Sequence, residues 1–458
     1  MGSEWREVSL SQLYDFRSGL SKPRSEFGFG YPFLSFKDVF YNFFVPRELN
    51  ELVNSTEQER RSCSIKRGDV FLTRTSETME ELGMSCVALE DYESATFNGF
   101  TKRLRPKDNT AIVPEYAAYY FRSPKFRLEI TAMSSLSTRA SLNNEMLGRL
   151  KMTLPSLEEQ AAIGVILKKF DDKIELNRRM NATLEAIARA LFKSWFVDFD
   201  PVWENIKRKE GNARVPGRKG AEESAHPGAP ALPEHILALF PDGFEDSELG
   251  PIPAGWRVGR VADLGEIVCG KTPPTRNPEN YGTDVPFITI PDMHGKVFAP
   301  HTRKMLSRIG ANTQVNKFLP KFSICVSCIA TPGLVVITSE KSQTNQQINS
   351  VIPFREFSPF YCYELLNRLG DQIRSGGSGG SVFANLNKTR FSNINIVLAH
   401  PSQIDAFHEL VEPLFEAMLA NERESRTLAA LRDTLLPRLI SGELRVADAE
   451  RFLAEAGV

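Results

Sequence analysis

One stretch of this chain occurs twice. Residues 142–195 recur as residues 386–439 at a constant offset of 244 positions (386 minus 142). Upstream of this stretch the register drifts, but Gly19 reappears as Gly270 at the same spacing from a preceding Trp-Arg pair. A period this long excludes a solenoid repeat. We therefore interpret the chain as two copies of one unit, each a globular module followed by a long helix.

The composition is that of a soluble globular protein. The 458 residues are 41% hydrophobic and 25% charged, which suits about three domains at most. We find no apolar run of about 18 residues and no signal peptide in the polar first ten residues, so we expect a cytoplasmic protein without a membrane partner. The six scattered cysteines resemble neither a disulfide framework nor a zinc site, and we expect no metal.

The charge is unevenly distributed, although the net charge is only -1. Residues 248–399 hold 16 Lys and Arg against 10 Asp and Glu, a surplus of six positive charges. Residues 400–458 hold 6 against 11, a surplus of five negative charges. Positive modules favour contact with phosphate, whereas acidic helices favour contact with protein partners.

Each long helix carries a stripe of apolar residues that alternate by four and three positions, the spacing of a coiled-coil seam. Polar Asn177 and Asn181 interrupt the first stripe, and Asn421 and Ser425 interrupt the second at the matching positions. Buried polar side chains in a seam fix register and orientation. The predicted seam positions are Ile163, Leu167, Phe170, Ile174, Asn177, Asn181, Leu184, Leu191, Phe407, Val411, Leu414, Met418, Asn421, Leu428 and Leu435.

This matched interruption favours mutual pairing of the two helices over the alternative that each stripe packs only on its own module. Since each helix leads away from its module, we expect an antiparallel pair that holds the two modules apart. The stretch from Ile163 to Trp195 would be about 50 Å long at about 1.5 Å per residue.

The modules are predicted to be rich in short strands. β-branched and aromatic runs indicate strands at residues 70–73, 86–89, 287–290, 323–329 and 335–337. One short helix is expected in each module, at residues 114–122 and 359–369. Irregular Gly, Pro and charged residues between positions 207 and 233 indicate a flexible connector. The predicted fold class is α+β.

Several motifs resemble those of type I restriction-modification specificity subunits. The Leu-Glu-Glu-Gln run at 157–160 and the run from Leu191 to Val202 are similar to the family's central conserved region. Residues 249–256 and 435–444 are similar to its other hallmarks. One departure is residues 401–405, Pro-Ser-Gln-Ile-Asp, where the first copy has the 155–160 box, so the start of the second long helix is less well defined.

The resemblance implies two β-rich target recognition domains, related by a pseudo-twofold internal repeat and separated by a long antiparallel two-helix coiled coil. It implies that each domain reads one half of a split double-stranded DNA sequence. Two methyltransferase subunits and the restriction or translocase subunits would dock on this scaffold. S-adenosylmethionine, ATP and Mg would belong to those partners, with no cofactor in this chain. The domain boundaries expected are 1–154 and 248–399 for the recognition domains, 155–200 and 400–440 for the long helices, 201–247 for the linker and 441–458 for the tail.

The candidate DNA contacts are side chains of the types that read base edges or bind phosphate. In the first module they are Lys22, Arg24, Lys37, Arg74, Thr75, Asn98, Lys102 and Arg139. In the second module they are Lys271, Thr272, Arg276, Lys296, Thr331, Gln346, Gln347 and Lys388.

One motif argues for an enzyme instead. Residues 265–272 satisfy the phosphate-binding pattern G-x-x-x-x-G-K-[ST]. Pro273 and Pro274 follow at once, and proline is poorly suited to open the helix whose amides would hold phosphate. We therefore expect a turn at the edge of a module, with Lys271 and Thr272 free for DNA. With no other catalytic signature in the sequence, we predict a noncatalytic, sequence-specific DNA-binding scaffold. The alternative is a coiled-coil scaffold whose modules bind protein.

Overall fold

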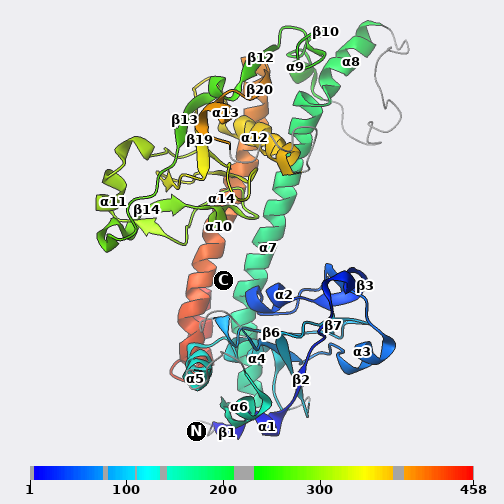
Figure 1. The fold of residues 1–458 in the computed structure, drawn as a ribbon, viewed down its shortest axis with the longest axis vertical. Helices are drawn as coiled ribbons and strands as arrows, with labels where there is room; N and C mark the ends of the chain where they lie inside the picture. Colours follow the sequence, from blue (N-terminus) through cyan, green and yellow to red (C-terminus); the bar gives the residue numbers. More distant parts are fainter. Residues whose placement is uncertain are drawn as a thin grey trace. The chain divides into compact units, whose positions relative to one another are not determined.

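The computed structural model describes residues 5–75, 81–108, 111–134, 142–210, 232–374 and 386–456. They form two compact units, the first of Met1–Glu175 with Arg426–Val458 and the second of Leu176–Ser425. Each unit therefore combines one module with part of both long helices (Figure 1). Within the described ranges, no helix is long and apolar enough to cross a membrane.

The first module is built from three small sheets. A four-stranded antiparallel sheet has the order β2 (Tyr14–Ser18), β8 (Thr101–Pro106), β5 (Val70–Thr73), β6 (Ser85–Val87). A mixed sheet places β3 (Phe27–Leu34) between antiparallel β4 (Glu51–Val53) and parallel β7 (Thr96–Phe97). β1 (Arg6–Ser9) pairs with β9 (Lys151–Leu154), so the two ends of the module meet.

Strand β5 lies at the centre of the first module. Val70 and Leu72 belong to one apolar cluster, and Phe71 between them belongs to another. Both faces of the strand are therefore covered, which explains why its sequence is apolar without alternation. The strand predicted at residues 70–73 is confirmed with the same bounds.

The second module repeats this topology strand for strand. The four-stranded sheet has the order β13 (Gly265–Cys269), β19 (Ile348–Pro353), β16 (Ile324–Ser327), β17 (Val335–Ile337). The mixed sheet places β14 (Tyr281–Ile288) between β15 (Met305–Leu306) and parallel β18 (Gln343–Thr344). β12 (Arg257–Arg260) pairs with β20 (Asn395–Leu398). The internal repeat thus extends through the regions where the sequence match is fragmentary.

Short helices connect the strands. Residues 114–122 and 359–369 were predicted to be helical, and the structure has α4 (Pro114–Tyr120) and α12 (Pro359–Arg374) there. Others, such as α2 (Phe36–Tyr41) with its Ser35 cap and α3 (Glu57–Ser62) with its Thr56 cap, were missed because they are too short to show a helical period. The remaining short helices are α1 (Leu10–Leu13), α2 (Phe36–Tyr41), α3 (Glu57–Ser62), α5 (Pro124–Ser134), α6 (Asn144–Arg149), α10 (Ile290–Met293), α11 (Arg308–Asn312) and α13 (Lys388–Ser392).

The two long helices are α7 (Leu157–Phe196) and α14 (Pro401–Ile440). A buried glutamine organises the start of each. Gln160 Oε1 accepts from the Val113 amide at 3.0 Å. Gln403 Oε1 accepts from the His400 amide at 2.9 Å, and Gln403 Nε2 donates to the Leu239 carbonyl. The second helix therefore begins at Pro401 in spite of its different sequence.

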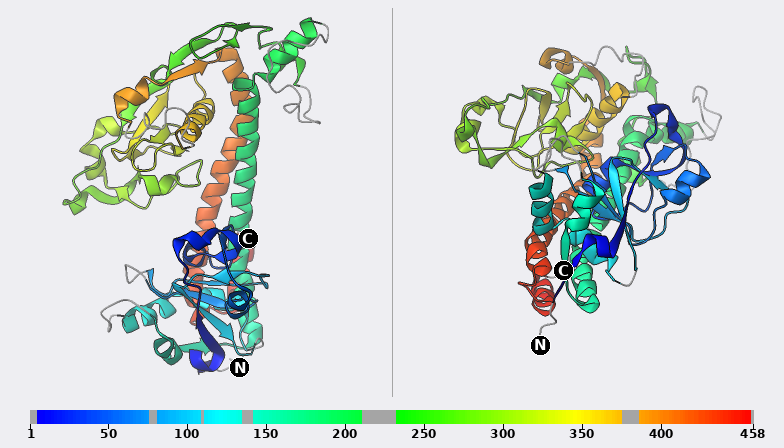
Figure 2. Two further views of the ribbon diagram at one scale, coloured as in Figure 1. Left: turned by 45° about the vertical axis from the view of Figure 1, so that its right-hand side comes forward. Right: turned by 60° about the horizontal axis from the view of Figure 1, so that its bottom comes forward.

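α7 and α14 pack against each other antiparallel within each unit (Figures 1 and 2). In the first unit, Ile163 and Phe170 share an apolar cluster with Leu428 and Leu435. In the second unit, residue numbers that increase along α7 meet residue numbers that decrease along α14. Asn177 contacts Ser425, and Asn181 contacts Met418. None of the predicted seam residues is exposed.

The polar positions of the seam bind one another. Asn421 Nδ2 donates to Asn181 Oδ1 at 2.8 Å, and Asn181 Nδ2 donates to the Met418 carbonyl at 3.2 Å. Asn177, only 1% exposed, donates to Glu424 Oε2 at 2.7 Å. A different register would bury these amides without partners, so they fix the alignment of the helices.

A tyrosine at equivalent positions attaches each module to the helix pair. Tyr119 Oη of α4 donates to Asp171 Oδ2 at 2.5 Å, and Arg432 of α14 forms an ion pair with the same carboxylate. In the second unit, Tyr363 of α12 donates to Glu185 Oε1 of α7 at 3.3 Å. Burial raises the pKa of Asp171, opposed by the Arg432 charge.

The segments expected as linker and tail contain helices. α8 (Asp200–Lys209) buries Val202 and Ile206, and α9 (Glu234–Leu237) and a hairpin of β10 (Phe244–Glu245) with β11 (Ile252–Pro253) follow. Of the expected connector, residues 211–231 lie outside the described ranges. α15 (Val446–Ala456) packs on the core of the first unit through Ala449. α8 and α15 span only 10 and 11 residues, about three turns each, so the apolar period repeats too few times to predict a packed helix.

Replacing Asn181 with alanine should lower the free energy of unfolding by about 1–2 kcal/mol, because the Asn421 amide loses its acceptor inside the seam. The measurement is the denaturant midpoint at unchanged slope. The matched control is Thr183→Ala on the exposed side of the same helix, which should change stability by less than about 0.5 kcal/mol. Equal effects of the two substitutions would contradict a paired seam.

Candidate nucleic-acid interface

Four long-range backbone hydrogen bonds connect strand ends of the four-stranded and mixed sheets of the first module. They connect the ends of β2, β3, β5 and β7, the start of β8 and the segment before α6. The donors and acceptors are Leu20 N to Phe97 O (2.8 Å), Asn98 N to Leu34 O (3.1 Å), Arg74 N to Phe100 O (2.9 Å) and Leu142 N to Arg74 O (2.9 Å). We call this arrangement the junction frame.

The second module has the same junction frame. The four equivalent bonds are Lys271 N to Thr344 O (2.9 Å), Asn345 N to Ile288 O (3.3 Å), Cys328 N to Gln347 O (2.8 Å) and Leu386 N to Cys328 O (3.3 Å). These four bonds join backbone groups, so they form in both modules although most of the side chains at these positions differ.

Asparagines complete the frame in both modules. Asn98 Oδ1 accepts from the Phe100 amide at 2.7 Å, and Asn345 Oδ1 accepts from the Gln347 amide at 3.1 Å. Asn143 caps α6 by accepting from the Met146 amide. Asn387 caps α13 in the same way, by accepting from the Arg390 amide. These side chains shape the backbone, as expected of Asn in turns and at helix starts.

Two cations of the first module lie on this frame. Lys102 is 8% exposed and its Nζ donates to Asn144 Oδ1 at 2.7 Å, while Arg74 Nη1 donates to Ser18 Oγ at 3.3 Å. Burial, and then the charge of Arg74, lower the pKa of Lys102. Within the described residues, neither cation forms an ion pair with a carboxylate. A negatively polarised group on a ligand would therefore find two donors here.

The other candidates of the first module are dispersed. Lys22 forms an ion pair with Glu59 at 2.8 Å. Arg24 and Lys37 are exposed, and Thr75 is half-buried next to Arg74. Arg139 lies outside the described residues. The structure thus brings Arg74, Asn98 and Lys102 together and leaves Lys22, Arg24 and Lys37 elsewhere on the module.

In the second module, five of the candidates lie on the frame and one lies beside it. Thr272 Oγ1 donates to Gln346 Oε1 at 2.6 Å, and Gln347 Oε1 accepts from Asn345 Nδ2 at 3.0 Å. The Thr331 carbonyl accepts from Ser327 Oγ, beside Cys328. Those on the frame are Lys271, Thr272, Gln346, Gln347 and Lys388.

Two candidates of the second module lie away from the frame. Arg276 is exposed in the segment before Pro278. Lys296 follows α10 and interacts electrostatically with Glu422 of α14, where it opposes the burial that raises the pKa of that carboxyl. Their charges are therefore not part of the group on the junction frame.

Sequence reasoning missed other side chains on the frame. Phe100 is 60% exposed beside Asn98, and Asn144 holds Lys102. Asn349 is 2% exposed, and its Oδ1 is buried without a partner. Asn98 and Asn345 are equivalent asparagines that stand shortly before β8 and β19 in the two modules. This repeated asparagine is the sequence signal that could have located the frame residues around it.

Residues 265–272 do not form a phosphate-binding loop. Gly265–Cys269 is strand β13 of the four-stranded sheet, which corrects our expectation of a turn there. The amide of Lys271 donates to the Thr344 carbonyl and is not available to a phosphate. The next helical segment is a single 3-10 turn at Pro278–Asn280, not a helix that opens at Thr272. The segment pairs antiparallel with β19, which lies far along the chain.

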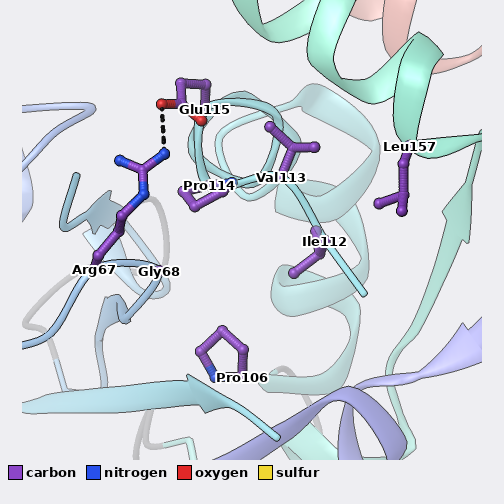
Figure 3. Close-up of a pocket in the computed structure, with 8 residues that line it drawn as sticks. All are labelled: Arg67, Gly68, Pro106, Ile112, Val113, Pro114, Glu115 and Leu157. Carbon is purple, nitrogen blue, oxygen red and sulfur yellow. Dashed lines mark hydrogen bonds and ion pairs between the residues drawn. The ribbon is translucent and has the colours of Figure 1, made fainter. Parts of the chain in front are cut away.

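A cavity of about 400 Å³ lies in the first unit beside the start of α7 (Figure 3). Its wall is largely apolar, and its cation, Arg67, forms an ion pair with Glu115 at 3.1 Å. None of the candidate DNA contacts lines it, and it does not suit an anion. The lining residues are Arg67, Gly68, Pro106, Ile112, Val113, Pro114, Glu115 and Leu157.

Comparison with known proteins identifies the class. Residues 2–186 and 253–405 match the family described as type I restriction modification DNA specificity domain. The specificity subunit of the type I restriction enzyme HindI from Haemophilus influenzae is 36% identical over 96% of this chain and all of its own length. The MjaIX specificity subunit from Methanocaldococcus jannaschii is 25% identical over 86% of this chain and 82% of its own.

Among solved structures, the S subunit from M. genitalium covers 95% of this chain and 96% of its own, with 14% identity and a TM-score of 0.47.

The chain belongs to the family of type I restriction-modification specificity subunits. It is a DNA specificity subunit, the noncatalytic component of such a system. The resemblance noted in the sequence and the predicted α+β fold, with two β-rich domains and a packed pair of long helices, are confirmed.

Substituting Gly19 or Gly270 with alanine should destabilise the junction frame. A methyl group at Gly19 would stand 2.3 Å from the Phe97 carbonyl oxygen, and at Gly270 it would stand 2.1 Å from that of Asn345. Overlap with backbone on this scale costs about 1–3 kcal/mol, measurable as a lower thermal midpoint. Gly243→Ala, with no atom within 4 Å of the added methyl, is the control. Midpoints of Gly19→Ala and Gly270→Ala equal to that of the control would show that the frame tolerates displacement.

Proposed function

We propose that this subunit reads a bipartite double-stranded DNA target, one half-site with each module, and serves as the scaffold on which two methyltransferase subunits and restriction or translocase subunits assemble. The observation that carries the proposal is the duplicated junction frame with its different polar side chains. A duplicated reader with two side-chain sets suits a target made of two unlike halves separated by a gap. The continuous helices α7 and α14 would set the length of that gap.

The methyltransferase partner would dock on an apolar stripe of α7. Leu176, Met180 and Ile187 are 47%, 43% and 50% exposed. Spaced by four and seven residues, they lie on one face of the helix, away from the Asn177 seam. Such a stripe is typical of a surface that pairs with a partner helix. S-adenosylmethionine, ATP and Mg would be bound by these partners.

Mixing experiments test the central proposal. The purified chain alone should neither methylate DNA nor hydrolyse ATP. Together with its methyltransferase subunits it should direct modification that requires S-adenosylmethionine to a bipartite duplex. Because DNA binding releases counterions, the logarithm of affinity should fall linearly with the logarithm of salt concentration. Methylation by the lone chain would contradict the proposal. Tight binding that is insensitive to salt would instead favour modules that bind protein.

The docking surface makes a separate prediction. Met180→Glu should abolish or weaken co-purification with the methyltransferase subunit by tenfold or more while leaving the thermal midpoint of the lone chain unchanged, because Met180 is outside the core. The matched control is Ala182→Glu, which places the same charge on another exposed side of α7. If Met180→Glu assembles as well as Ala182→Glu, the stripe is not the docking site.

A further inference from the structure

The two modules carry different side chains at equivalent positions of the same frame. Since the hydrogen bonds of the frame match one to one, they define the pairs without any sequence alignment. Asn98 and Asn345 are the same residue type, and each accepts a hydrogen bond from the backbone amide two residues later. The pairs that differ are Arg74 with Cys328, Phe100 with Gln347, Lys102 with Asn349, and Asn144 with Lys388.

In the first module the exchanged positions form a cationic donor group. Arg74 and Lys102 are held near each other, and the Nε of Arg74 is buried without a partner in the described structure. Ser18 and Asn144 each take one hydrogen bond from these cations, which fixes their side chains. Phe100, 60% exposed, adds an aromatic face next to them. This set presents hydrogen-bond donors and an apolar surface.

In the second module the same positions are uncharged at the centre. Cys328 is 1% exposed in place of the arginine, and Asn349 is 2% exposed in place of the buried lysine. Gln347 stands where Phe100 stands in the first module. The cation of this set is Lys388, which is exposed at the start of α13. Asn349 Nδ2 donates to the Leu386 carbonyl at 3.2 Å inside the module, so the half-buried Gln347 is the amide that this set presents.

We propose that three exchanged positions that are not buried, Arg74 and Phe100 in the first module and Gln347 in the second, are base-reading residues, with Arg74 donating to acceptor atoms on a base edge in the first half-site. The inference rests on the proposed function. A guanidinium matches the paired O6 and N7 acceptors of guanine in the major groove, whereas the amides of Gln and Asn match adenine. The shared frame therefore presents different chemistry to each half-site without a change in backbone.

The test uses the chain assembled with its methyltransferase subunits and a duplex library randomised in one half-site at a time. Bound DNA is sequenced for the unaltered chain and for two variants of the first module. Arg74→Lys keeps the charge but removes the planar fork. Phe100→Gln places the second module's residue at an exposed position, where it does not disturb folding. Arg61→Ala, on a side chain that is 79% exposed in an ion pair with Glu57, is the control.

Arg74→Lys is expected to reduce discrimination at one base position of the first half-site by about tenfold or more. Phe100→Gln is expected to alter the preference of the same half-site. Both should leave the second half-site as it is with the unaltered chain. The inference is overturned if neither variant changes the first half-site, or if both weaken all sequences equally, as loss of a phosphate contact would do. Failure of the unaltered chain to select any bipartite duplex would instead reject the proposed function.

Discussion

The packing of α7 against α14 is the interaction on which both units depend. The core of the first unit includes Leu428, Leu435 and Leu439 from α14, the second long helix. The core of the second unit includes Phe192 and Trp195 from the first long helix. Burying each such side chain contributes about 1.5–3 kcal/mol. Neither copy of the repeat therefore holds a complete core of its own, and the chain must return to its first module to finish it.

The asparagines of the seam give this packing its alignment. Apolar residues alone would accept a shift by one heptad, because the stripe would look much the same after seven residues. Asn177, Asn181 and Asn421 have partners in one register only. The attachment of each module by Tyr119 or Tyr363 then follows from that register. The seam thus determines where along the helices each module is held.

If the proposed base-reading role is right, the junction frame separates shape from recognition within each module. Backbone amides and a repeated asparagine hold the frame in both modules, although several of the other side chains on it differ. This arrangement suits a protein whose two readers must differ from each other while their scaffold stays the same. Residues on loops that a rigid core positions are where such functions usually lie.

The sequence was sufficient to predict the two long helices, because an apolar spacing that averages 3.5 residues and continues for many turns is typical of a helix and not of a strand. It also located β5 and β17, whose runs are apolar and bounded by turn residues. The junction frame could not be predicted, since it joins segments that are distant in sequence through backbone groups that no residue type reveals. The strand β13 was missed for a similar reason: its partner β19 lies about eighty residues further on.

Sequencing of modified bases in genomic DNA, from cells that carry this chain with its methyltransferase subunits as the only such system, tests the account most directly. The account predicts methylation within two unlike sequence blocks separated by a gap of constant length and free composition. A single uninterrupted motif, two identical blocks, or a gap that varies in length would contradict two different readers joined by the paired helices α7 and α14.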